Sequence, residues 1–290
     1  MVENNVKQYK DRKSTVKYIL AKIFIVLILL LMYAPILYLM IFSFTDSDVV
    51  GKWNGFSFET YIRLFSTNNY YSQKIWVAVG NTLLIAICSG ICTTLIGTIG
   101  AIGMFYAKKR VRNVLDFMTQ IPVVNAEIVI AISLAILFVT LKWERSFFTL
   151  LIGHTVLTFP FVVLSVQPKL KQMDPNLYEA ALDLGATQTQ ALFKTVLPEI
   201  FPGIISGFML SVTLSLDDYI ITAFTRPSFA SNGMVFDTLS TYVDSATKKS
   251  GLPIQLRALT TIIFIAILLV MIIINIRASR KNKNLLKKGA

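Results

Sequence analysis

Long apolar segments dominate this sequence and restrict the folds that are open to it. Six of them approach or exceed the roughly 20 residues that a helix needs to cross a bilayer. Hydrophobic residues make up 54% of the chain and charged residues only 15%, whereas soluble proteins carry about 25% charged residues. The sequence therefore predicts an all-α, polytopic membrane protein with six transmembrane helices, at residues 18–44, 76–107, 114–141, 146–166, 203–225 and 254–276.

Basic residues gather at the ends of these segments and predict their orientation. Lys and Arg number six up to Lys22, four in residues 108–113, three in 167–202 and six from Arg277 onward, and the other nine are spread over the alternate loops. Loops rich in Lys and Arg stay in the cytoplasm, so both termini are expected there. The predicted organisation is a cytoplasmic tail at 1–17, a six-helix membrane domain at 18–276 with a cytoplasmic loop at 167–202, and a basic cytoplasmic tail at 277–290.

The same residues argue against several other classes of protein. The net charge of +12 follows the membrane topology and forms no patch typical of nucleic-acid binding. The chain contains no GxxxxGK[ST] phosphate loop and no Ser/His/Asp, HExxH or CxxC constellation, so neither an enzyme nor a cofactor is indicated. Cys88 and Cys92 are interpreted as small packing residues and His154 as a hydrogen-bonded interior residue.

Small residues and prolines predict how the helices meet and where they bend. Gly97, Gly100 and Gly103 in the second segment, and the GxxxG of Gly203 and Gly207 in the fifth, favour close helix contacts. Kinks are expected at Pro35, Pro122 and Pro160, and residues 56–65 (FSFETYIRLF) are expected to form a short interfacial helix.

The loop at residues 167–202 carries the signals of two short helices. Asp174 is a suitable N-cap, Pro175 fits the first helical position and Gly185 is a plausible stop. Residues 187–190 (TQTQ) match a capping box for a second helix, and Pro198 is expected to limit the extent of that helix.

Acidic residues inside the apolar segments are the main candidates for a functional site. Within the six spans these are Glu127, Asp217 and Asp218, with Asp116 near a cytoplasmic end. The bases Lys22 and Arg226 are placed at span ends, and none is expected in the interior. A buried intramembrane carboxylate is costly and is by default a functional hypothesis. On a continuous fifth helix the two aspartates would point toward neighbouring helices or a path for a cation. The alternative is a structural role, in hydrogen bonds to backbone or to another subunit.

Residues 179–198 (EAALDLGATQTQALFKTVLP) resemble the EAA loop of ABC importer permeases. Thr195 stands where the family usually has Ile. The resemblance implies a type I importer permease fold and a loop that inserts into a groove on a separate ATP-hydrolysing subunit. The positions that carry the family pattern are Glu179, Ala180, Ala181, Gly185, Leu197 and Pro198.

Further segments are similar to the spermidine/putrescine permeases of this superfamily: YAPILYLMIFSF, AEIVIAISLAILF, LTFPFVVLSV and LSLDDYIITAF. The resemblance implies a multi-pass protein of the bacterial cytoplasmic membrane, surrounded by lipid, that imports polyamines. It also implies a second permease subunit, two ATP-binding cassette subunits and an extracytoplasmic binding protein as partners. Relatives that handle thiamine, ferric iron or opines leave those substrates open, and an ion-coupled transporter or channel would also explain the intramembrane acids but not the EAA loop.

Overall fold

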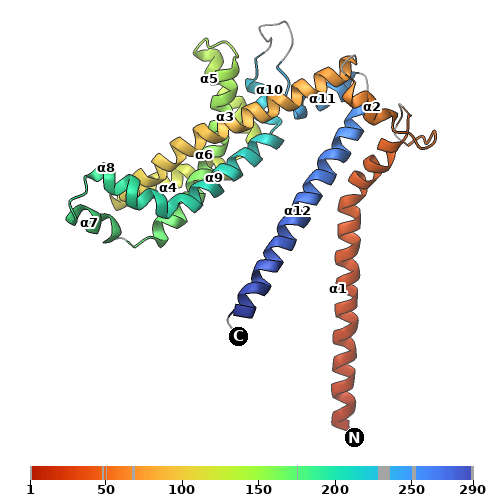
Figure 1. Cartoon of the computed structure of the whole chain (residues 1–290), viewed down its shortest axis with the longest axis horizontal. Helices are drawn as coiled ribbons and strands as arrows, with labels where there is room; N and C mark the ends of the chain where they lie inside the picture. Colours follow the sequence, from red (N-terminus) through yellow and green to blue (C-terminus); the bar gives the residue numbers. More distant parts are fainter. Residues whose placement is uncertain are drawn as a thin grey trace. The chain divides into compact units, whose positions relative to one another are not determined.

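The computed structural model describes residues 2–47, 49, 51–66, 69–174, 176–227, 236–249 and 253–288, and these residues form helices and connecting turns without a β-strand. Figure 1 shows the helices along the chain. They are α1 Val2–Ile41, the 3₁₀ turn η1 Phe42–Phe44, α2 Glu59–Phe65, α3 Tyr70–Tyr106, α4 Lys109–Val124, α5 Glu127–Thr140, α6 Phe147–Gln172, α7 Asn176–Asp183, α8 Gln188–Ala191, the π-helical turn η2 Leu192–Val196, α9 Leu197–Asp217, α10 Ile220–Thr225, α11 Leu239–Lys249 and α12 Ile254–Lys288.

The predicted all-α class is confirmed, and the predicted spans correspond to helices long and apolar enough to cross a bilayer. Among the described residues, five segments are each long and apolar enough to cross a bilayer. The helices α4 and α5 would form a sixth span if they are counted together as one bent segment. The helices α1 and α12 also extend into the residues assigned to the two tails. The chain forms two compact units: Met1–Gln73 together with Ser250–Ala290, and Lys74–Lys249.

The first unit is built around the contacts of α12 with α1, η1 and α2. The short helix predicted at residues 56–65 is confirmed over Glu59–Phe65, which form α2, whereas residues 56–58 are not helical. Aromatic rings join α2 to η1, with 5.3 Å between the ring centroids of Phe44 and Tyr61. Tyr61 adds a 2.7 Å hydrogen bond between its hydroxyl and that of Ser43.

Arg257 corrects the expectation that the spans hold no interior base. This residue lies in the first turn of α12, inside the predicted sixth span, and its side chain is buried. Its Nη1 donates to the carbonyl oxygen of Ser47 at 2.8 Å. A backbone carbonyl thus meets part of the hydrogen-bonding demand of the guanidinium, which is how a buried base is usually accommodated.

The second unit has its core where α6 packs along α9. Val162, on α6, lies where small residues let neighbouring helices come close: a Cβ added at Gly97 would lie 2.8 Å from a Val162 methyl, and one at Gly207 would lie 3.2 Å away. A Cβ at Gly203 would meet the Ser165 carbonyl at 3.0 Å. The predicted close contacts are therefore confirmed at these glycines, but not at Gly103, where an added Cβ would meet nothing within 4 Å.

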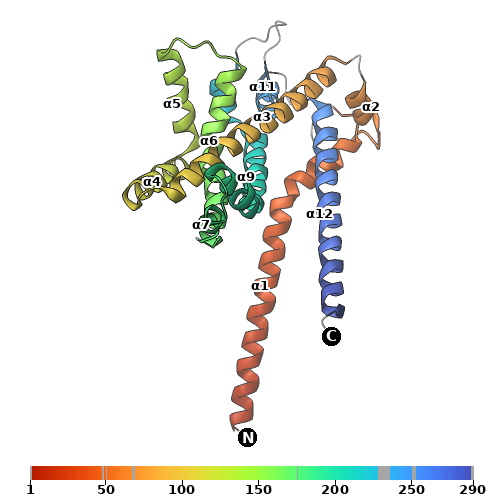
Figure 2. The same cartoon turned by 60° about the vertical axis from the view of Figure 1, so that its left-hand side comes forward.

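The predicted third span, residues 114–141, is not one helix. It is two helices, α4 and α5, whose axes differ by 105° (Figure 2). Asn125 and Ala126, which separate them, have extended backbones. Pro122 lies in the last turn of α4 and cannot donate a backbone hydrogen bond, so it weakens the helix just before the break.

The predicted fifth span, residues 203–225, is also interrupted. Its helix ends at Asp217, Asp218 has an extended backbone, and α10 starts at Ile220. A helical projection that carries Asp217 and Asp218 onward to Thr225 therefore does not hold.

The second loop helix also differs from expectation at its end. Its capping box is confirmed: Gln190 N donates to Thr187 Oγ1 at 3.3 Å and Gln190 Oε1 accepts from Thr187 N at 3.1 Å. Pro198 does not end the helix, because α8 continues through the π-helical turn η2 into α9. Pro198 falls at the start of α9, directly after a turn whose hydrogen bonds are already displaced by one residue, so its missing N–H is tolerated there.

Candidate functional site

The break in the fifth span is organised by the side chain of Asp218. Its carboxylate accepts from the backbone N–H of Ile221 at 3.1 Å, and from the backbone N–H and hydroxyl of Thr222 at 2.9 Å each. Only 6% of Asp218 is exposed. These contacts satisfy the first free N–H groups of α10, so Asp218 caps that helix.

His154 joins the break to the core of the second unit. Its imidazole is buried. Nδ1 lies 2.7 Å from the Ser215 hydroxyl and Nε2 lies 3.0 Å from the Thr222 hydroxyl. The Nε2 atom is also 3.6 Å from the Asp218 carboxylate. The prediction that this histidine is a hydrogen-bonded interior residue is confirmed. The polar network ties α6, α9 and α10 together at the point where the helix is interrupted.

Asp217 and Glu127 are placed differently from Asp218, because both are exposed in the isolated chain. Glu127 is in the first turn of α5, a favourable position for a negative charge. Beyond it, Ala131 of α5 packs against Ile221 of α10. Glu127 thus begins one of two neighbouring helices, α5 and α10, and Asp217 and Asp218 directly precede the other. One of the three carboxylates is engaged in hydrogen bonds and two are exposed.

The short helix α11 is hydrogen-bonded to the same break, a contact that was not predicted from the sequence. Ser240 Oγ donates to the Asp218 carbonyl at 2.7 Å, and the Tyr219 hydroxyl donates to Asp244 Oδ2 at 2.9 Å. The Lys248 ammonium binds the same Asp244 oxygen at 2.9 Å. Hydrogen bonds from Lys248, then from Tyr219, lower the pKa of Asp244, so this anchor stays ionised at neutral pH. The i, i+4 spacing of Asp244 and Lys248 was the available sequence signal.

The loop at residues 167–202 presents its tip to solvent. The helix α7 ends at Asp183, and Gly185, the predicted stop, follows two residues later with a φ of +85°. The N–H of Ala186 reaches back to the Ala181 carbonyl at 3.1 Å. Glu179, Ala180 and Gly185 are exposed, and Leu184 is 89% exposed. The tip of the loop therefore combines a left-handed turn with exposed side chains.

A comparison with protein families identifies the family of this chain. The model of a family described as "Binding-protein-dependent transport system inner membrane component" matches residues 93–283. The chain belongs to this family. It is therefore a multi-pass component of a transport system in the bacterial cytoplasmic membrane, and the matched range contains the exposed loop, both helix breaks and all three acids.

Named relatives of this transport component cover most of the chain. The putrescine transport system permease protein PotI of Escherichia coli (strain K12) is 34% identical over 243 residues, which is 81% of this chain and 82% of PotI. The spermidine/putrescine transport system permease protein PotC of Haemophilus influenzae is 29% identical over 268 residues, 92% of this chain and 99% of PotC.

A solved structure confirms the fold of the transport component. The chain aligns with a crystal structure of a bacterial ABC transporter involved in the import of the acidic polysaccharide alginate, with a TM-score of 0.61. The alignment covers 92% of this chain and 97% of the other, at 16% sequence identity. At this identity the likeness shows a shared permease fold and carries nothing about the substrate.

Proposed function

We propose that this chain is a permease subunit of an ATP-driven importer that carries polyamines into the cytoplasm. The observation that carries the proposal is the 34% identity to a putrescine permease over 82% of that protein's length. The exposed acids give it a chemical basis: among the described residues, neither Glu127 nor Asp217 forms an ion pair with a base. Open carboxylates without a basic partner suit a passing ammonium group.

The proposed assembly contains a second, related permease subunit, two ATP-binding cassette subunits and an extracytoplasmic binding protein. ATP hydrolysis is assigned to the cassette subunits, because this sequence has no phosphate-binding loop of its own. The coupling surface is assigned to Glu179, Ala180, Ala181 and Gly185 on the exposed turn, with Leu197 and Pro198 at the start of α9. The exposure of Glu179 and Ala180 and the left-handed backbone of Gly185 support this assignment.

Within the proposed path the three acids take different parts. The exposure of Glu127 and Asp217 supports contact with substrate. The burial and three hydrogen bonds of Asp218 support a structural role, in which it holds α10 in place beside them. The path would then run past the helix starts, where irregular backbone is tolerated because it lines a cavity or is covered by protein.

The transport function is tested with the complete complex in proteoliposomes that contain ATP. We expect uptake of labelled putrescine or spermidine that requires both ATP and the binding protein. The panel also includes thiamine, ferric iron and an opine, since relatives of this superfamily handle them. Uptake of one of these in place of polyamine would contradict the substrate, and uptake driven by an ion gradient without ATP would contradict the importer.

The proposed topology predicts which side of the membrane each loop faces. In a chain whose Cys88 and Cys92 are replaced by Ala, single cysteines are introduced as Lys109→Cys, Lys171→Cys and Lys248→Cys, all at exposed positions. Because basic loops stay inside, an impermeant thiol reagent is expected to reach the first two only from the cytoplasm and the third only from outside. Labelling with the sides exchanged would overturn the proposal that both termini are cytoplasmic.

A further inference from the structure

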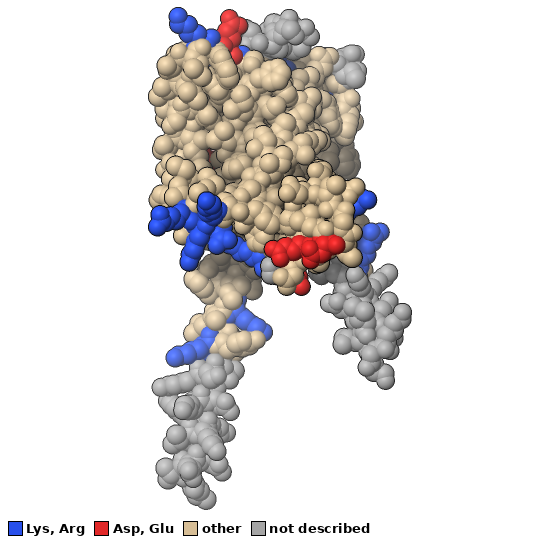
Figure 3. Space-filling model, turned by 90° about the vertical axis from the view of Figure 1, so that its left-hand side faces the viewer, with Lys and Arg blue, Asp and Glu red and all other residues tan. Residues whose placement is uncertain are grey.

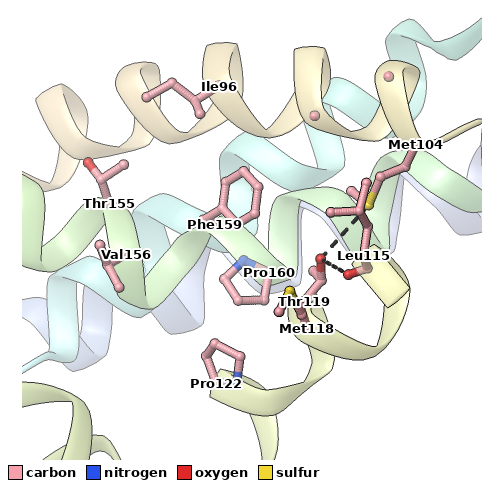
Figure 4. Close-up of a pocket in the computed structure, with 12 residues that line it drawn as sticks. Ile96, Met104, Leu115, Met118, Thr119, Pro122, Thr155, Val156, Phe159 and Pro160 are labelled. Atoms are coloured by element: carbon pink, nitrogen blue, oxygen red, sulfur yellow. Dashed lines mark hydrogen bonds between the residues drawn. The ribbon is translucent and has the colours of Figure 1, made fainter. Parts of the chain in front are cut away.

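An apolar groove lies between α3, α4 and α6 in the second unit (Figure 4), and none of the three acids lines it. It has a volume of about 560 Å³, within the range of about 300–1,000 Å³ that is usual for small-molecule sites. Ile96, Gly103 and Met104 line it from α3, Met118 from α4, and Val156 and Phe159 from α6.

The few polar groups of the groove are already satisfied. The Thr119 hydroxyl donates to the Leu115 carbonyl at 2.8 Å, and the Thr155 hydroxyl donates to the Leu151 carbonyl at 2.7 Å. Both bonds lie within the threonine's own helix. The two hydroxyl protons are therefore not available to a ligand, whereas a hydrocarbon chain would lose nothing by entering the groove.

Four basic residues stand at one end of the groove. Lys108, Lys109, Arg110 and Arg112 form the turn between α3 and α4 and the first turn of α4. None of them forms an ion pair among the described residues. Figure 3 shows Lys and Arg side chains gathered at the edge of a broad band of uncharged side chains, the pattern expected where hydrocarbon meets headgroups.

The groove is slightly shorter than one leaflet. Its lining residues on α3 run from Ile96 to Met104, which are eight helical residues apart, or about 12 Å along the axis. Half of a hydrocarbon core about 30 Å thick is about 15 Å. The groove can therefore take part of one acyl chain on the side of the basic turn. No residue of α4 is buried by the rest of the chain, so the apolar side of this helix remains available to an occupant.

We propose that this groove binds one anionic phospholipid, with an acyl chain between α3, α4 and α6 and the phosphate on Lys108, Lys109, Arg110 and Arg112. Charge complementarity favours this occupant over a helix of another subunit, which would have to bring acidic residues to the basic turn. None of the acids of the proposed polyamine path lines this site. Its effect would be to hold α4 against α3 and α6, and so to fix the bend between α4 and α5 where Glu127 begins its helix.

The test uses the full chain in phosphatidylcholine bilayers that contain a small fraction of a phospholipid with a photoreactive acyl chain. The probe is phosphatidylglycerol in one sample and phosphatidylcholine in the other. We expect phosphatidylglycerol to label the peptides that contain Met118 and Val156 severalfold more than phosphatidylcholine does. Replacing Lys109 and Arg110 together by Gln should lower this labelling by about fivefold for each charge removed. Lys142→Gln with Arg145→Gln, in the exposed turn after α5, removes the same charge elsewhere and should change nothing.

A second variant fills the groove. Gly103→Leu places a side chain in open space, because an added Cβ there meets no atom within 4 Å, and it should reduce the labelling to background. Gly80→Leu is the matched control on the same helix, at a position equally open but outside the groove. Equal labelling by both lipids, or unchanged labelling in either groove variant, would overturn the proposal. So would loss of labelling when the second permease subunit is bound, because the groove would then be a subunit interface.

Discussion

Asp218→Asn is expected to destabilise the folded chain by about 2 kcal/mol, whereas Asp217→Asn is expected to leave its stability within about 0.5 kcal/mol. The two changes are chemically identical and fall on adjacent residues. In the first, an amide replaces a carboxylate whose Oδ2 accepts two hydrogen bonds from Thr222 and whose Oδ1 accepts one from Ile221. An amide has one acceptor oxygen, so at least one buried donor loses its partner.

The environment of Asp217 explains the opposite result for its neighbour. Asp217 is the exposed last residue of α9, where a negative charge faces the negative end of the helix dipole. Removing that charge relieves a small repulsion and breaks no hydrogen bond that the structure shows within the chain. Its cost is expected in transport, because the same carboxylate is proposed to meet the substrate.

Thermal unfolding of the purified complex and polyamine uptake at limiting substrate separate the two roles. Asp218→Asn should unfold at lower temperature and reduce the amount of assembled complex, with uptake falling in proportion to that amount. Asp217→Asn should assemble normally and transport slowly. If instead Asp218→Asn unfolds at the wild-type temperature and its uptake per complex falls, the carboxylate belongs to the path and its capping role is refuted.

The sequence predicted the same role for Asp217 and Asp218, and it could not show that their environments differ. Apolar length correctly predicted where apolar helices form, because a helix in a bilayer must satisfy its own backbone whatever its neighbours do, but it did not predict the interruptions in the third and fifth spans. It did not show that the fifth span stops at Asp217. The cap that Asp218 forms on Ile221 and Thr222 is local, but other groups that meet at the break are distant in sequence. His154 is 64 positions before Asp218, and Ser240 lies in a different helix.

Short-range chemistry was predicted more reliably than long-range chemistry. The capping box of Thr187 and the stop at Gly185 depend on residues three or four positions apart, and both were predicted correctly. The break after Pro122, where α4 and α5 differ by 105°, was predicted only as a kink, because the packing of α5 on α10 joins residues distant in sequence and leaves no local signal. The burial of Arg257 was not predicted, because its guanidinium donates to the carbonyl of Ser47, which is distant in the sequence.

Gly185→Val is expected to reduce ATP-driven uptake by about tenfold or more without reducing the amount of chain in the membrane. Gly185 has a φ of +85°, in the left-handed region where a side-chain-bearing residue costs about 1–2 kcal/mol. A β-branched residue is among the least tolerant of this region. No atom lies within 4 Å of an added Cβ, so the side chain itself causes no clash within the chain. The cost falls on the backbone of the turn.

A strained turn would change the surface that the cassette subunit is proposed to cover. The hydrogen bonds from Gly185 N to the Leu182 carbonyl, at 2.9 Å, and from Ala186 N to the Ala181 carbonyl set the direction in which exposed Leu184 points. If valine forces the turn to relax, Leu184 and Glu179 no longer lie in one rigid arrangement. A loss of about 1.4 kcal/mol in docking corresponds to tenfold weaker association.

Gly185→Asn is the matched control, because Asn tolerates the left-handed region while adding a side chain of similar size. It is expected to retain uptake close to wild type. The measurements are co-purification of the cassette subunit, ATPase activity stimulated by the loaded binding protein, and uptake per complex. The valine variant should fail in all three and the asparagine variant in none. Equal losses in both variants would mean that any side chain at this position blocks docking, so that backbone conformation is not the cause. Normal coupling in the valine variant would remove Gly185 from the coupling surface.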